Sequence, residues 1–291
     1  MGKTIVTHDG KFHADDVFAV ATLLILDRTA TVVRTRKLEL ISKGDIVVDV
    51  GGSYNDSELR FDHHQKGGAG IRPNSVPYAA FGLVWKKFGE TLCGDKIVSR
   101  RVEETLVVPI DANDNGVTLF DSRLPGTSPY EISDAIRAFV PTWQEGEETI
   151  TVKFMEAVSF AIRVIEREIK RSEAVVAGQN IVTDIYHATS DKRLLELPED
   201  YSWKETLVGF PEPLYVVHPQ NGTWRLYCVR DNPHQFTNRK DLPESWAGLR
   251  DGDLAKVTGV EDAVFVHRNR FMAVTRSKEG ALALAQKALV S

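Results

Sequence analysis

The sequence has 291 residues, of which 42% are hydrophobic and 26% are charged, and these values are typical of a globular protein in water. The net charge of −5 excludes a strong basic field, so a nucleic-acid ligand would need a local basic groove or be a short oligonucleotide. The two cysteines, Cys93 and Cys228, lie far apart and argue against a disulfide framework. Residues 1–6 lack a signal-peptide pattern and no apolar run reaches the ~18 residues of a membrane span, so we expect a cytoplasmic protein without membrane contact.

Strand and helix patterns alternate in the first half of the sequence. They predict strands at residues 3–7, 31–35 and 45–50, with a helix at residues 15–28. Further on, helices are predicted near residues 78–88, 95–106 and 148–176, and a short strand at residues 107–110. This alternation favours an α/β domain with a mainly parallel sheet flanked by helices. Ligands of such sheets bind at the carboxyl ends of the strands.

The last third of the sequence has a different pattern. A polar segment with two prolines, residues 190–212, predicts a domain link. Residues 214–229 and 263–275 each have a hairpin pattern, and residues 280–290 predict an apolar helix. We therefore expect two domains, residues 1–190 and a smaller α+β domain of residues 191–291.

Histidines and aspartates are concentrated in two early motifs. His8, His13 and Asp15 lie in one predicted turn between a strand and a helix. Imidazole and carboxylate together suit a first-row divalent metal ion, although Asp15 as a helix cap is an equally good interpretation of this turn. The second motif is Asp62-His63-His64, in which one ring can bind a metal and the other a phosphate.

Two further aspartates, Asp49 and Asp111, each follow an apolar segment that we predict to be a strand. An acid in that position is either a helix cap or a ligand at the active edge of the sheet. All four features together favour a two-metal centre, in which ions roughly 3.5–4 Å apart clamp the attacking and leaving oxygens of a phosphate ester. The predicted ligands are His8, His13, Asp15, Asp49, His63 and Asp111.

These motifs, in this order, resemble the DHH phosphoesterase superfamily and, more closely, the melanocyte-proliferating-gene protein family. The resemblance extends over nearly the whole chain. It rests on Thr7-His8-Asp9-Gly10-Lys11-Phe12-His13-Ala14-Asp15-Asp16, Asp45-Ile46-Val47-Val48-Asp49-Val50-Gly51-Gly52, Phe61-Asp62-His63-His64-Gln65, Ile110-Asp111-Ala112-Asn113-Asp114-Asn115-Gly116 and Leu242-Pro243-Glu244-Ser245-Trp246-Ala247-Gly248-Leu249-Arg250.

The resemblance implies two divalent ions per site, Mn²⁺ above all, and phosphodiester hydrolysis, as a 3′–5′ exonuclease on RNA or short single-stranded oligonucleotides. It implies that His8, His13 and Asp49 bind one ion and that Asp15, His63 and Asp111 bind the other, with Asp49 as the bridge. His64 would contact the scissile phosphate, and Asp62 would support His63. The C-terminal domain would bind the substrate across a cleft.

Two departures from the superfamily concern the metal preference and the substrate, in that order, and leave the substrate open. The wider superfamily has an aspartate where this chain has His13, and the usual glycine-rich tract is replaced here by residues 271–276. Basic candidates for substrate binding are Arg34, Arg36, Arg239, His267 and Arg276, for which ordinary surface charge is the alternative. Two alternative functions stay open: a hydrolase of small phosphates such as pyrophosphate or nucleotide derivatives, and a metal- or nucleotide-binding protein without turnover. The oligomeric state is also open, and a homodimer is one possibility.

Overall fold

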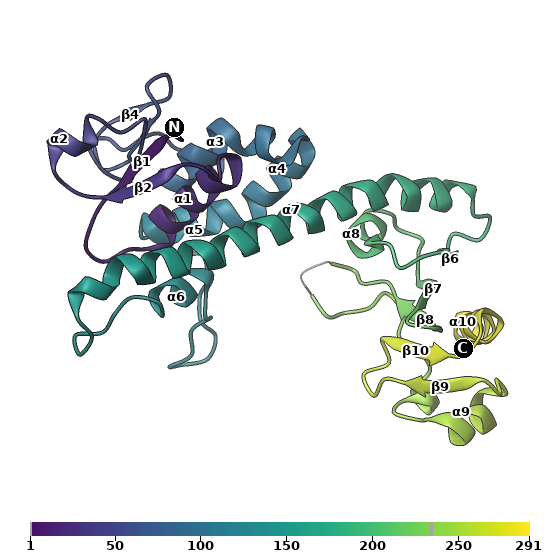
Figure 1. The fold of residues 1–291 in the computed structure, drawn as a ribbon. Coiled ribbons are helices and arrows are strands. Elements are labelled where there is room, and N and C mark those ends of the chain that lie inside the picture. The colour runs from purple at the N-terminus through teal and green to yellow at the C-terminus, as the bar shows by residue number, and fades with distance from the viewer. Residues whose placement is uncertain (1, 233–234) are drawn as a thin grey trace. The chain divides into compact units, whose positions relative to one another are not determined.

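The computed structural model describes residues 2–232 and 235–291, which form two compact units, Met1–Ser172 and Glu173–Ser291 (Figure 1). The division falls inside the long helix α7 (Ile150–Ala188), which extends the helix expected at residues 148–176. The expected domain boundary at residues 190/191 stays a prediction. In the described part of the chain, no helix is long and apolar enough to cross a membrane.

The sheet of the first unit has the strand order β2-β1-β3-β5-β4. Its strands are β1 (Thr4–Thr7), β2 (Thr31–Arg34), β3 (Ile46–Val48), β4 (Tyr54–Asn55) and β5 (Arg60–Phe61). β1 pairs in parallel with β2 and β3, β3 pairs in parallel with β5, and only β4 runs antiparallel to its neighbour. The fold is therefore α/β, as expected, and the carboxyl ends of β1, β3 and β5 share one edge.

The helix α1 (Ala14–Leu26) packs against α3 (Ala80–Cys93) and forms the centre of this unit. Its side chains from Val17 to Ala21 have no exposed surface, and Phe81, Leu83 and Val84 of α3 are equally buried. Burial of each large apolar side chain stabilises the fold by roughly 1.5–3 kcal/mol. The opposite face of the sheet packs Val6 and Val47 against Ile41 of the short helix α2 (Leu38–Ile41). The tight α1–α3 packing fixes the position of the residues at the beginning of α1.

The prediction of a strand at residues 107–110 is wrong. These residues belong to a helical stretch made of α4 (Lys96–Val102), a π-helical turn (Glu103–Val107) and α5 (Val108–Asp114). A short apolar run cannot be assigned to strand or helix from its periodicity alone, and Pro109 made a helix less expected. The proline lies in the first turn of α5, where its missing N–H is tolerated, and the wider π turn precedes it.

A short helix, α6 (Ile132–Arg137), follows the irregular segment 117–131 and contacts α1 and α5. Its inner residue Ile136 has no exposed surface. α6 therefore lies beside the same helices that carry the candidate ligands at the beginning of α1 and the end of α5.

The second unit begins inside α7 and contains a sheet of order β6-β7-β8-β10-β9. Its elements are β6 (Leu194–Glu196), α8 (Trp203–Val208), β7 (Tyr215–Gln220), β8 (Thr223–Cys228), α9 (Asp251–Thr258), β9 (Ala263–Val266), β10 (Met272–Thr275) and α10 (Lys278–Val290). Both expected hairpins are confirmed. In the first, Asn221 and Gly222 have φ of 52° and 73°, the left-handed values that such a tight turn requires.

Candidate metal centre

Three neighbouring strand ends place the candidate ligands of the sheet. His8 directly follows β1, Asp49 follows β3, and the Asp62-His63-His64 motif follows β5. The backbone at Asp49 is in the left-handed region, with φ of 55°, and its side chain is only 4% exposed. A non-glycine residue adopts this conformation at a cost, and such strain is common where a side chain must be aimed at a functional site.

The beginning of α1 adds His13, Asp15 and Asp16. Oδ1 of Asp16 accepts hydrogen bonds from the backbone N–H groups of His13 at 2.8 Å and Val17 at 3.0 Å, so Asp16 caps α1. Asp15 does not cap its own helix. Its carboxylate accepts hydrogen bonds from the N–H groups of Ala80 at 2.9 Å and Phe81 at 2.6 Å, at the beginning of α3.

A first group of ligand atoms comes from His8, His13 and Asp16, whose ligand atoms lie within 4.8 Å of one another. His8 Nε2 is 3.2 Å from Asp16 Oδ2 and 3.4 Å from Asp49 Oδ2. A cation held here would therefore be close to two imidazoles and to two carboxylates.

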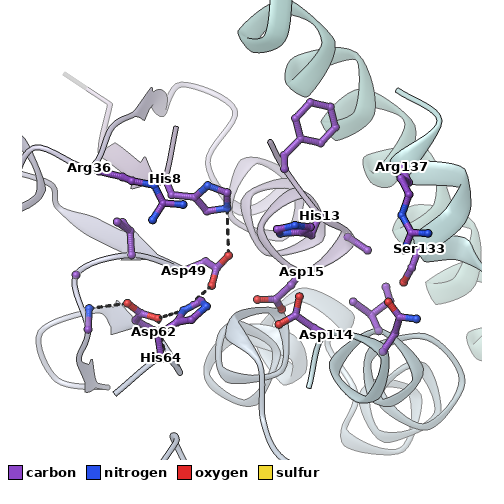
Figure 2. A pocket seen from close by; sticks show the side chains of 17 residues that line it. His8, His13, Asp15, Arg36, Asp49, Asp62, His64, Asp114, Ser133 and Arg137 are labelled. Atoms are coloured by element: carbon purple, nitrogen blue, oxygen red, sulfur yellow. Dashed lines mark hydrogen bonds and ion pairs between the residues drawn. The ribbon is translucent and has the colours of Figure 1, made fainter. Parts of the chain in front are cut away.

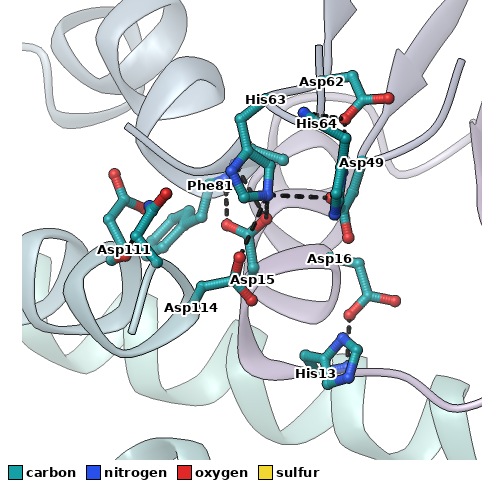
Figure 3. Close-up of polar contacts among 12 residues, drawn as sticks. His13, Asp15, Asp16, Asp49, Asp62, His63, His64, Phe81, Asp111 and Asp114 are labelled. Atoms are coloured by element: carbon teal, nitrogen blue, oxygen red, sulfur yellow. Dashed lines mark hydrogen bonds and ion pairs between the residues drawn. The ribbon is translucent and has the colours of Figure 1, made fainter. Parts of the chain in front are cut away.

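Two further groups share His63: one with Asp49 and His64, the other with Asp15 and Asp114 (Figure 3). His63 Nε2 is 3.1 Å from Asp114 Oδ2, 3.5 Å from Asp49 Oδ1 and 3.9 Å from Asp15 Oδ2. The two oxygens of Asp49 thus face different histidines, Oδ2 toward His8 and Oδ1 toward His63. This places Asp49 between the groups, the position that a bridging carboxylate needs.

Asp111 belongs to none of these groups. Its Oδ2 is 2.7 Å from Arg72 Nη1, and its Oδ1 accepts a hydrogen bond from the N–H of Gly82 at 3.0 Å. Asp114, one helical turn further along, faces His63 instead. Because the sequence pattern predicted a strand at residues 107–110, it could not anticipate that Asp111 and Asp114 would have these different surroundings. On a helix, Asp111 and Asp114 are an i, i+3 pair of neighbours, so a helix prediction here would have made Asp114 a candidate beside Asp111.

Asp62 supports His64, and the structure does not show the expected support of His63. Asp62 Oδ1 is 2.8 Å from His64 Nδ1 and also accepts the backbone N–H of His64 at 3.1 Å. Its Oδ2 accepts the N–H of Gly52 at 2.6 Å. An aspartate readily bonds the backbone two residues further on, and this geometry brings its carboxylate to the His64 ring.

The concentrated negative charge changes the protonation of the histidines. Burial opposes the protonation of His8, but Asp16 and Asp49 outweigh it and raise the pKa of His8 to about 10. Burial also opposes the protonation of His63. Asp114 and Asp49 outweigh this effect and raise the pKa of His63 to about 11. Burial raises the pKa of Asp49, but His63 and His8 beside it lower that pKa to about 2. The carboxylates of the site thus stabilise a positive charge placed among them.

Buried polar atoms give an independent test of whether a metal ion fits. Asp16 Oδ2, Asp49 Oδ1 and His63 Nε2 are buried and make no hydrogen bond. Unsatisfied buried polar atoms are costly, and all three belong to the residue types that bind first-row divalent ions. The donor set therefore fits divalent metal ions.

The groups of ligands open into a pocket of about 620 Å³ (Figure 2). Arg36 lines it, as do His64 and Asp62, whereas Arg34 does not. The guanidinium of Arg34 lies 4.4 Å from the ring centre of Phe154 and donates to the carbonyl of Gly10 at 2.7 Å. In this structure Arg34 supports the loop that carries His8 and His13.

The three basic candidates of the second unit have local contacts of their own. Arg239 donates to the carbonyls of Phe210, Pro213 and Val208. Arg276 is 3.5 Å from Asp251, and His267 accepts the N–H of Asn269 at its Nδ1. Arg239 is therefore engaged in holding its own loop, and the substrate role of all three stays a prediction.

The fold and the site define an α/β protein with a candidate centre for divalent metal ions. Residues 4–289 match the sequence model MYG1_exonuc, described as "Uncharacterised protein family (UPF0160)". The chain belongs to this MYG1 family, which confirms the family resemblance of its motifs.

Relatives from different organisms match over nearly the whole chain. The MYG1 exonuclease of Homo sapiens is 31% identical over 98% of this chain and 85% of its own length. A MYG1 protein of Schizosaccharomyces pombe is 29% identical over 98% and 97% of the two chains. Among solved structures, RecJ from Thermus thermophilus in complex with Mg²⁺ is 11% identical, with a TM-score of 0.30, and the match covers 100% of this chain and 50% of that one.

Proposed function

We propose that the protein is a metal-dependent phosphodiesterase that uses two divalent ions, Mn²⁺ above all, and acts as a 3′–5′ exonuclease on RNA or short single-stranded oligonucleotides. The observation that carries this proposal is the position of Asp49, whose two carboxylate oxygens face His8 and His63 at 3.4 and 3.5 Å. The exonuclease name of the human relative supports the choice of reaction.

The structure suggests a revised division of the ligands. His8, His13, Asp16 and Asp49 would hold one ion, and Asp15, Asp49, His63 and Asp114 would hold the other. Asp16 joins the predicted set, and Asp114 replaces Asp111. Bound ions of this kind lower the pKa of water, so that hydroxide is present near neutral pH.

We infer that His64 contacts the substrate, for two reasons. It lines the pocket and is 62% exposed, whereas His63 is 8% exposed. Because Asp62 contacts Nδ1 of His64, the opposite ring nitrogen, Nε2, is left for the scissile phosphate or the leaving oxygen. Asp62 thereby fixes the orientation of the ring, the role that a carboxylate commonly has beside a functional histidine.

Asp114→Asn and Asp111→Asn distinguish the two ligand sets. We would incubate each variant with Mn²⁺ and a 5′-labelled single-stranded RNA, and count bound Mn²⁺ by isothermal titration. Wild type should give a ladder of shortening products. Asp114→Asn should bind Mn²⁺ at one site at least about tenfold more weakly and lose activity in proportion, whereas Asp111→Asn should keep both ions.

Asp56→Asn is the matched control, since Asp56 is half exposed and pairs with Lys87 away from the pocket lining. Two tight ions in Asp114→Asn would contradict the revised ligand set. No product with wild type, but turnover of pyrophosphate or a nucleotide derivative, would replace the exonuclease with a hydrolase of small phosphates. Two bound ions without turnover of any of these substrates would indicate a binding protein.

A further inference from the structure

The charges that line the pocket are strongly uneven. Its ionisable lining residues are four aspartates, three histidines and only two arginines, Arg36 and Arg137. A phosphate substrate is an anion, so a further phosphate beyond the metal ligands is bound more tightly where the protein offers a cation. The two arginines are the permanent cations that the lining offers, and they lie on opposite sides of the ligand cluster (Figure 2).

Arg36 lies on the side of the sheet, two residues after β2. Its Nε is 3.5 Å from Asp9, and 64% of its side chain is exposed. This is the side that also carries His8, Asp49 and the Gly51-Gly52 turn. Arg36 therefore lines the pocket on the same side as these candidate ligands.

Arg137 lies on the other side, at the last residue of α6. Ile136, next to it, is completely buried, so the backbone beneath Arg137 is anchored. Two further polar residues of this wall line the pocket: Ser133, one turn earlier on α6, and Asn113 of α5, whose amide donates to Glu131 at 3.2 Å. The polar side chains on this side of the pocket therefore lie on an anchored backbone, which suits the binding of a polar part of a ligand.

The existing contact of Arg137 leaves most of its hydrogen-bonding capacity unused. Its Nη1 is 3.2 Å from Asp134, one turn back on the same helix, and 72% of its side chain is exposed. A guanidinium has five N–H donors in a planar fork that matches the oxygens of a phosphate. An exposed ion pair within one helix is weak, so a phosphate can displace or share it.

We propose that Arg137 binds a second phosphate of the substrate, next to the phosphate held at the ligand cluster. The preferred substrate is then a nucleotide chain with at least two phosphates, one at each of these places. This inference rests on the proposed phosphodiester hydrolysis. It extends that function because it assigns a role in substrate selection to α6, which is not among the motifs that predicted the metal centre.

The test compares dinucleotides that differ by one phosphate: ApA, which has only the scissile group, and its 5′- and 3′-phosphorylated forms, pApA and ApAp. Wild type should prefer at least one phosphorylated form by about tenfold in kcat/KM, the expected size of a charge-assisted contact. Arg137→Ala should remove that preference through KM and change the turnover of ApA by less than about twofold. Arg137→Lys should restore it only in part.

Arg100→Ala is the matched control, because Arg100 also makes an exposed pair within one helix, with Glu104, and does not line the pocket. Binding of the preferred dinucleotide with a methylene group in place of the scissile bridging oxygen gives a readout without turnover. Its Kd should rise about tenfold in Arg137→Ala alone. Equal losses on ApA and on the phosphorylated forms, or no loss at all, would overturn the proposal.

The binding experiment also separates this inference from the proposed function. If wild type hydrolyses none of the dinucleotides but the analogue binds in an Arg137-dependent way, the hydrolysis is refuted and the second phosphate site stands. If wild type hydrolyses them and Arg137→Ala behaves as Arg100→Ala does, the phosphodiesterase stands and the phosphate site is refuted.

Discussion

Arg72 neutralises a carboxylate that has no contact with solvent. It is itself almost completely buried, is 2.7 Å from Asp111, donates to Glu103 at 3.0 Å, and lies over the ring of Tyr78. Burial raises the pKa of Asp111 to about 7, although Arg72 acts in the opposite direction. The Arg72 guanidinium therefore supplies the positive charge nearest to this buried carboxylate.

We expect Arg72→Met to lower the free energy of unfolding by about 3–5 kcal/mol at pH 8, because the Asp111 carboxylate is then buried without its partner. With Arg72 present the pKa of Asp111 is about 7, and removing Arg72, which lowers that pKa, raises it further, so the variant continues to lose stability above about pH 7 where wild type no longer does. Urea unfolding in EDTA at pH 5 and pH 8 should therefore show the larger loss at pH 8. Adding Asp111→Asn should restore most of it; the same loss at both pH values would contradict this account.

At the scale of elements, α3 and α5 approach closely at Gly82. A Cβ atom at this position would lie 1.8 Å from Asp111 Oδ2 and 2.5 Å from Arg72 Nη2. Both of those side chains are held by the buried ion pair and cannot move aside freely. The contact fixes α5, and with it the direction in which Asp114 points.

Gly82→Ala should therefore destabilise the protein by at least about 1–3 kcal/mol, although alanine is normally the better helix former. Gly252→Ala, in α9, is the control, since nothing lies within 4 Å of its added Cβ. The control should stabilise by up to about 1 kcal/mol. Both changes can be measured by urea unfolding followed by circular dichroism, and an unchanged midpoint for Gly82→Ala would refute the close approach.

At the scale of the whole molecule, the two compact units should respond differently to metal. All candidate ligands lie in Met1–Ser172, and the second unit has its own buried core around Tyr215, Leu226 and Leu284. A ligand that binds only the folded state stabilises it by RT ln(1 + [L]/Kd), about 2.7 kcal/mol at a hundred times Kd.

Mn²⁺ added to protein stripped with EDTA should therefore slow amide hydrogen exchange in α1 and leave exchange in β7 and β8 unchanged. Exchange of peptides from both regions, followed by mass spectrometry, would measure this. Equal protection of both regions would show that the units unfold together, and no protection of α1 would count against a metal site in the first unit.

The local sequence pattern was enough to predict many of the helices and strands of this protein. Period and flanking residues predicted β1, β2, β3, α1, α3 and α7 and both hairpins of the second unit, because a strand or an amphipathic helix carries its own signal. They missed the short elements α2, β4, β5 and α6, which are too short to show a period. The rule that parallel strands present ligands at their carboxyl ends correctly predicted the positions of His8 and Asp49. The strand β5 before Asp62-His63-His64 was not predicted, and Asp111, predicted to follow a strand, lies on a helix. The structure brings both histidines of the Asp62-His63-His64 motif together with His8 and Asp49.

Only the tertiary structure decided which side chains face one another within that cluster. Asp111 and Asp114 are three residues apart on one helix, and packing against Gly82 and Arg72 directs the first away from His63 while the second faces it. Asp15 and Asp16 are neighbours, yet one contacts α3 and the other caps α1. The sequence by itself determined the longer helices and strands, because their signals are local. Which side chains contact one another depends on the packing of segments that are distant in the sequence, and no local pattern contains that information.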